Sequence, residues 1–140
     1  LALQGGQEFE DPESYQSQAL AWLEGNDFSQ TASNLSVVQR YALACIYYAT
    51  NGVRTLATDL ILGQGAIPPG WITTNNWLGG DECDANNPWF GITCENGLVT
   101  EMVLASNRIT GSFPSETQLL RQSLIHIDLF RNPVYNTGDE

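Results

Sequence analysis

The sequence predicts an α+β chain in which a helical N-terminal region is followed by a short repeat solenoid with parallel strands. Two observations lead to this prediction. Apolar residues recur at helical spacing in the first third of the chain, and a strand-like pattern that begins at residue 99 begins again at residue 124. The chain has 140 residues, enough for one ordinary domain or two small ones, and its apolar content of 42% can supply a core.

The charge of the chain excludes several classes of partner. Its net charge is −11, and all five cationic residues are Arg. Nucleic acids and anionic lipid headgroups require a basic face, so we expect neither as a partner. A basic protein surface is compatible with this charge, and acidity that only keeps the chain soluble is the simpler interpretation. No stretch has the roughly 18 apolar residues that a transmembrane segment needs.

The first predicted helix covers residues 13–24. Asp11 can cap its start and Pro12 suits the first helical position. Apolar residues then follow at helical spacing until Gly25 ends the pattern. The segment 26–35 that comes next is polar and is predicted to be a loop.

The second predicted helix is the apolar run 37–50, which follows a capping-box pattern made by Ser36 and Gln39. Because apolar residues cover nearly its whole circumference, we expect this helix to be buried. A third, short helix is predicted over 54–62. Asn34 begins the sequon Asn-Leu-Ser, which makes it a candidate glycosylation site that overlaps the start of the second helix.

The three cysteines divide into a pair and a single residue. Cys83 and Cys94 lie close together in a region rich in Gly, Asp and Asn, whereas Cys45 lies in the apolar helical run. This distribution suggests one disulfide, which would imply an oxidising compartment, and one buried, inert thiol. A zinc site is the weaker alternative, because zinc takes four ligands and His126, the sole His, lies far along the chain.

Residues 99–109 and 124–134 both match the leucine-rich-repeat pattern L-x-x-L-x-L-x-x-N-x-L. In such a repeat the fourth and sixth positions point inward from a strand, and the Asn bonds backbone groups that would otherwise be buried without partners. Parallel strands, one from each repeat, then stack into a solenoid. The matched positions are Val99, Met102, Leu104, Asn107 and Ile109, and then Leu124, Ile127, Leu129, Asn132 and Val134.

The sequence resembles a known family around these repeats. NRITGSFPSE at 107–116 is similar to the N-x-L-x-G-x-I-P-x-E of plant-type extracellular leucine-rich repeats. Upstream, WLGGDEC at 77–83 and PWFGITC at 88–94 resemble the N-terminal cap of that family. The resemblance implies a cap disulfide between Cys83 and Cys94.

The helical segments extend this resemblance, since 18–23 and 39–52 look like the cap helices of algal, diatom-type members. The likeness covers roughly residues 14–136, but the array has two repeats where family members commonly carry many. It implies three parts, which are a helical region (1–70), a disulfide-bonded cap (71–97) and two leucine-rich repeats (98–140).

Such a short array would leave an open edge on the last predicted strand, near residues 125–130. Three alternatives follow: residues 133–140 fold over the edge, a partner covers it, or the chain continues in further repeats. The second alternative makes the outward strand residues candidate binding residues. They are Glu101, Val103 and Ala105 in the first repeat and His126, Asp128 and Phe130 in the second.

The main functional hypothesis is therefore a non-enzymatic protein-binding module without a cofactor or a metal. Its partner would be a protein that is basic or that covers the open edge. The alternative is a small accessory subunit of a larger assembly, such as one at a photosynthetic membrane. The expected compartments are the extracellular space or an organelle lumen, the thylakoid lumen included.

A carbohydrate-acting hydrolase is the remote alternative. It would use neighbouring carboxylates as acid and base, or aromatic rings as a sugar platform. A solvated acidic loop and a packed aromatic core are the simpler interpretations of these residues. The carboxylates are Asp81, Glu82 and Asp84, and the rings are Trp71, Trp77 and Trp89.

Overall fold

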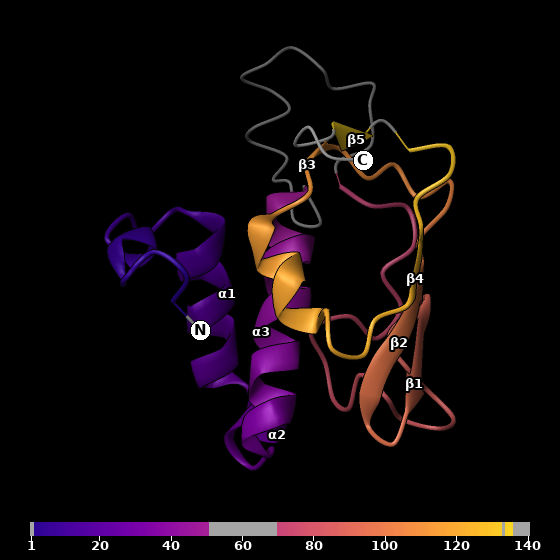
Figure 1. Ribbon diagram of the computed structural model, residues 1–140, viewed down its shortest axis with the longest axis horizontal. Coiled ribbons are helices and arrows are strands. Elements are labelled where there is room, and N and C mark those ends of the chain that lie inside the picture. Colours follow the sequence, from indigo (N-terminus) through magenta and orange to yellow (C-terminus); the bar gives the residue numbers. More distant parts are fainter. Residues whose placement is uncertain (1, 51–69, 133, 136–140) are drawn as a thin grey trace.

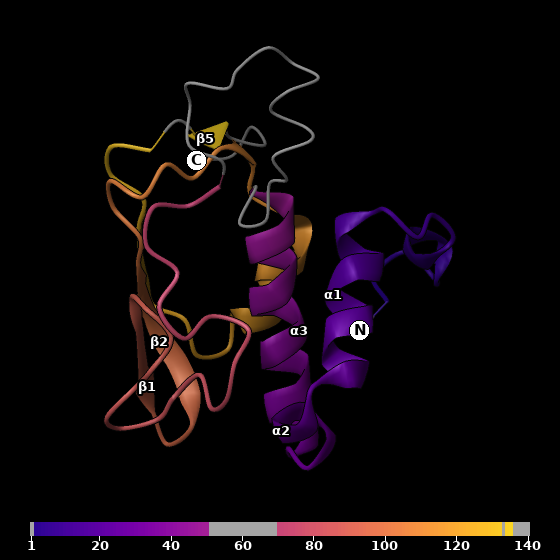
Figure 2. The same cartoon turned by 180° about the vertical axis from the view of Figure 1, so that it is seen from behind.

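The computed structural model describes residues 2–50, 70–132 and 134–135. One long helix lies in the middle of the molecule, with a second helix on one side and the strands on the other (Figures 1 and 2). The predicted third helix at 54–62 falls outside the described residues. The helical elements are η1 (Gln7–Phe9), α1 (Tyr15–Gly25), α2 (Asp27–Gln30), α3 (Asn34–Ala49) and η2 (Ser115–Leu120).

Helix α1 begins later than the sequence suggested. The hydroxyl of Ser14 accepts a hydrogen bond from the backbone N–H of Ser17 (3.0 Å), so Ser14 is the capping residue in place of Asp11. The carboxylate of Asp11 instead accepts from the N–H of Glu13 in the preceding turn. After α1, Asn26 caps the short helix α2, which corrects the prediction of an uninterrupted loop over 26–35.

Helix α3 is the centre of the core, and it begins before the predicted capping box. Ser33 caps it by accepting from the backbone N–H of Ser36 (3.2 Å), so Ser36 already lies inside the helix. The predicted burial is confirmed, because the helix packs on both sides. Tyr41, Ala44 and Cys45 face α1 in one cluster, and Ala42, Leu43, Ile46 and Tyr47 face the strands in another.

The strands form one mixed sheet and one small parallel pair. In the sheet, β1 (Ile92–Glu95) pairs with β2 (Leu98–Val103) in antiparallel fashion, and β2 pairs with β4 (His126–Asp128) in parallel. The small pair joins β3 (Gly111–Ser112) to β5 (Val134–Tyr135). Among the described residues, β4 is therefore an edge strand of the three-stranded sheet.

The prediction of a short leucine-rich-repeat solenoid with parallel strands is wrong, because this sheet is mixed. The reason is the tight turn at Asn96 and Gly97, where both residues have positive φ angles (54° and 80°). A two-residue Asn-Gly turn of this kind joins antiparallel strands, so the chain forms a hairpin before it reaches the first matched repeat position. Within this sheet the β2–β4 pairing keeps the predicted parallel arrangement, and the separate β3–β5 pair is parallel as well.

The strand side of α3 is filled by aromatic rings. Trp77 lies 4.8 Å from Trp71 and 5.0 Å from Trp89, measured between ring centroids, and Tyr47 of α3 packs against two of these rings. All three tryptophans are buried, so they belong to the core and offer no platform for a sugar. No helix in the described part of the chain is long and apolar enough to cross a membrane.

Candidate functional site

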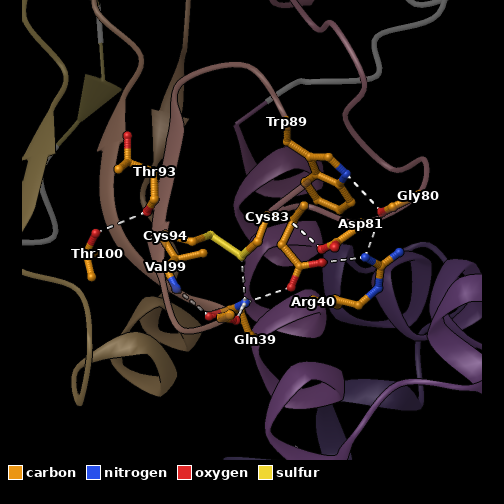
Figure 3. Close-up of a disulfide and its surroundings, with 12 residues drawn as sticks. Gln39, Arg40, Gly80, Asp81, Cys83, Trp89, Thr93, Cys94, Val99 and Thr100 are labelled. Carbon is orange, nitrogen blue, oxygen red and sulfur yellow. Dashed lines mark hydrogen bonds and ion pairs between the residues drawn. A yellow bond between two sulfur atoms is a disulfide. The ribbon is translucent and has the colours of Figure 1, made fainter. Parts of the chain in front are cut away.

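The disulfide between Cys83 and Cys94 is confirmed. It joins the acidic loop to β1, with Cα atoms 5.7 Å apart and a sequence separation of 11 residues (Figure 3). For a loop of this size, restriction of the unfolded chain stabilises the folded state by roughly 3 kcal/mol. The bond therefore fixes the loop and the hairpin against each other at the end of the sheet.

Gln39 of α3 lies beneath this disulfide and connects three segments (Figure 3). Its Nε2 donates to Oε2 of Glu82 (2.7 Å) and to the carbonyl of Gly97 (3.1 Å). Its Oε1 accepts from the backbone N–H of Val99 (2.7 Å). One buried amide thus positions the acidic loop and the hairpin turn on the central helix.

Arg40 is fully buried beside Gln39, and its hydrogen bonds account for the five N–H donors of a guanidinium. Its ion pair with Glu82 is equally buried. The rings of Trp22, Phe28 and Trp89 lie 4.7–5.3 Å from the guanidinium carbon. The acceptors are Ser29 Oγ, Asn26 Oδ1, Glu82 Oε1 and the carbonyls of Gly79 and Gly80.

The prediction of a solvated acidic loop is thus wrong for Glu82. The ligand atoms of Asp81, Glu82 and Cys83 lie within 4.8 Å of one another, which is close enough to consider a metal ion. However, the sulfur of Cys83 is in the disulfide, and both oxygens of Glu82 already accept hydrogen bonds from α3. This set therefore does not fit a metal.

Both asparagines of the repeat pattern bond to backbone groups of a neighbouring segment. Asn107 accepts from the N–H of Thr73 (2.6 Å) and donates to its carbonyl (3.0 Å). Asn132 in turn accepts from the N–H groups of Asn107 and Ile109 (2.9 Å each) and donates to the carbonyl of Leu104 (2.7 Å). The bonds of Asn132 thus satisfy backbone groups where the chain leaves β2, and those of Asn107 satisfy both backbone groups of Thr73, upstream of β1.

Four of the six candidate binding residues lie on one face of the β2–β4 pair, and the other two, Ala105 and Phe130, lie in the turns that follow the strands. Glu101 lies beside His126, and Val103 lies beside Asp128, in the parallel register. The pairing continues past the strand ends, because the N–H of Ser106 donates to the carbonyl of Phe130 (2.8 Å) and so keeps Ala105 and Phe130 adjacent. The outward alternation along the strands explains this shared face.

An exposed apolar patch lies along β4 and its ends, and sequence reasoning foresaw only part of it. Ile125 is 79% exposed and Phe130 is 66% exposed. Ile127 belongs to the inward row opposite buried Met102, yet it is 37% exposed because no described strand lies beyond β4. We call the exposed residues Val103, Ile125, Ile127 and Phe130 the edge patch, which draws on both faces of the sheet because Val103 is in the outward row and Ile127 in the inward row.

The free thiol of Cys45 does not contribute to a surface site. It is fully buried between α3 and α1, and this burial raises the pKa of the thiol to about 12. The reactive thiolate is therefore scarce at any pH well below that value.

We expect Cys45 in the native chain to resist a disulfide-exchange reagent at pH 8, whereas the unfolded, non-reduced chain should react with one equivalent. Absorbance of the released thiolate measures both values. Cys45→Ala should react with none under either condition, which checks that the disulfide is closed. Rapid reaction of the native wild-type chain would contradict the burial of this thiol.

No family model matches the chain, and no solved structure matches it significantly.

Proposed function

We propose that this chain is a non-enzymatic protein-binding module that uses the β2–β4 face and the adjoining edge patch. The exposure of Ile125, Ile127 and Phe130 beside the edge of β4, which no other described strand pairs with, is the observation that supports this proposal. Apolar side chains grouped at a sheet edge mark interaction sites, since native proteins rarely leave such an edge bare. Membership of the leucine-rich-repeat family remains a proposal based on the sequence motifs.

The charge on the same face suggests the kind of partner. Glu101 and Asp128 lie on neighbouring strands of the face, and the chain as a whole carries a net charge of −11. A partner with a basic rim around an apolar centre would complement both the carboxylates and the edge patch. The disulfide fits an oxidising compartment, so we propose an extracellular or lumenal partner.

The test compares the amount of each protein that binds to the immobilised wild-type chain with the amount that binds to each of two immobilised variants under identical conditions. Ile125→Asp/Phe130→Asp places charge in the edge patch, and Leu35→Asp is the control because Leu35 is 67% exposed but belongs to α3. We expect proteins bound specifically by the wild type to bind at least about tenfold less to the patch variant, because apolar residues at the centre of an interface each contribute about 2 kcal/mol or more. The control should bind as the wild type does.

Quantitative mass spectrometry of the bound fractions gives this ratio, and circular dichroism checks that each variant is folded. Equal binding to all three chains would overturn the assignment of the edge patch as the interaction surface.

The second candidate is an accessory subunit held permanently in a larger assembly, and the edge that β4 leaves free within the described part of the chain favours it too. The candidates differ in the behaviour of the purified chain. A free-standing binding module should sediment as a stable monomer, whereas a permanent subunit should aggregate through its uncovered edge.

A further inference from the structure

Asn34 is exposed, and its side chain makes no hydrogen bond to the rest of the described residues. It is the first residue of α3, but the capping role belongs to its neighbour Ser33, whose hydroxyl accepts from the N–H of Ser36. Modification of the side-chain amide of Asn34 would therefore break no contact that holds the helix in place.

The sequence around Asn34 has the form that N-linked glycosylation requires. The motif is Asn34-Leu35-Ser36, with no proline in the middle position. The chain has eleven asparagines, and the other ten all lack a Ser or Thr two residues later. The disulfide fits passage through an oxidising compartment, where secreted chains meet the glycosylation machinery.

We propose that Asn34 is an N-glycosylation site of this chain. In the transfer, the amide nitrogen of Asn34 forms a bond to the anomeric carbon of a lipid-linked oligosaccharide. The bond between that carbon and the lipid pyrophosphate breaks, the pyrophosphate leaves with the electron pair, and the amide releases one proton.

The surroundings of Asn34 suit a sugar. Leu35 is 67% exposed and lines a groove of about 390 Å³, together with apolar residues such as Leu98 and Leu119 and polar residues such as Gln118 and Gln122. A glycan on Asn34 would lie beside this groove and could bond its polar side chains. The start of α3 lies apart from β4 in both views, so the glycan would leave the edge patch open (Figures 1 and 2).

The test expresses the full chain behind a secretion signal in a eukaryotic host and measures its intact mass before and after an N-glycosidase. The wild type and Ser36→Thr should carry mass that the enzyme removes, with at least equal occupancy in the Thr variant, because both keep the motif. Asn34→Gln and Ser36→Ala should have the mass of the bare polypeptide. Ser36→Ala is the sharper control, since it retains Asn34 itself.

Transfer precedes folding, so chains retained inside the cell are as informative as secreted ones. A wild-type chain that has formed its disulfide yet has the mass of the bare polypeptide would overturn the proposal. Glycosidase-sensitive mass on both Asn34→Gln and Ser36→Ala would overturn it as well, because the sugar would then lie elsewhere.

Discussion

Replacing Arg40 with Met is expected to lower the free energy of unfolding by about 3–5 kcal/mol, because the substitution leaves the Glu82 carboxylate buried beside no cation. Both side chains of the pair are almost completely buried. The variant also removes one of the two donors to each of the carbonyls of Gly79 and Gly80, which keep those of Asn26 and Trp89. Urea denaturation followed by tryptophan fluorescence measures the loss, and the rings beside Arg40 make that signal sensitive to this region.

The double variant Arg40→Met/Glu82→Gln distinguishes two causes of the lost stability, which are the isolated buried charge and the lost packing of Arg40 against the rings. It removes both charges, while the carboxamide introduced at position 82 can still accept from the amide of Gln39, so it should be more stable than Arg40→Met alone. A double variant no more stable than the single one would assign the effect to lost packing against the rings. A loss below about 1 kcal/mol in Arg40→Met would show that Arg40 does not anchor the acidic loop.

Replacing Gly91 with Ala is expected to destabilise the fold by about 3–4 kcal/mol, through both backbone strain and overlap. Gly91 has a φ angle of 82°, and a Cβ atom there would lie 2.3 Å from the carbonyl oxygen of Val103. That oxygen is backbone, so the strand itself would have to move. The movement would disturb the hydrogen bond from the N–H of Val103 to the carbonyl of Gly91 (2.8 Å).

Gly97→Ala is the matched control for this prediction. Gly97 has nearly the same φ angle, 80°, but a Cβ atom there would meet nothing within 4 Å. Only the strain remains, so we expect a loss of about 1–2 kcal/mol. Urea midpoints of the two variants provide the comparison, and equal losses would show that the close approach of Gly91 to β2 contributes nothing.

The features that could be predicted from the sequence depend on neighbouring residues. The burial of α3 follows from apolar residues around its whole circumference, and the common face of Glu101 and His126 follows from strand alternation together with the 25-residue offset. The Asn-Gly pair at 96–97 is also a local signal, because it favours a two-residue hairpin turn. The prediction of parallel strands followed the repeat pattern and took no account of this turn, so it did not include the antiparallel strand β1.

The remaining features depend on contacts between distant residues, which leave no local pattern. Nothing around Glu82 in the sequence distinguishes it from exposed Asp84, yet only Glu82 lies against Arg40, 42 positions away. The exposure of Ile127 is a similar case. Strand alternation predicts that its side chain points inward, but it does not predict whether another segment covers the side chain. Likewise, Asp11 and Ser14 are both good capping residues, and the structure has Ser14 capping α1 while Asp11 accepts from Glu13 in the preceding turn.

The arrangement around Arg40 also determines how this sequence can diverge over time. Two of its five acceptors are backbone carbonyls, which persist when the side chains of the acidic loop change. The contacts of Arg40 therefore do not depend on the side chains of Asp81 or Asp84. A single change that removes the charge at position 40 or 82, by contrast, leaves the other charge buried and isolated. Among distant descendants of this chain, we expect the pair to be kept as Arg and Glu, or to be lost at both positions.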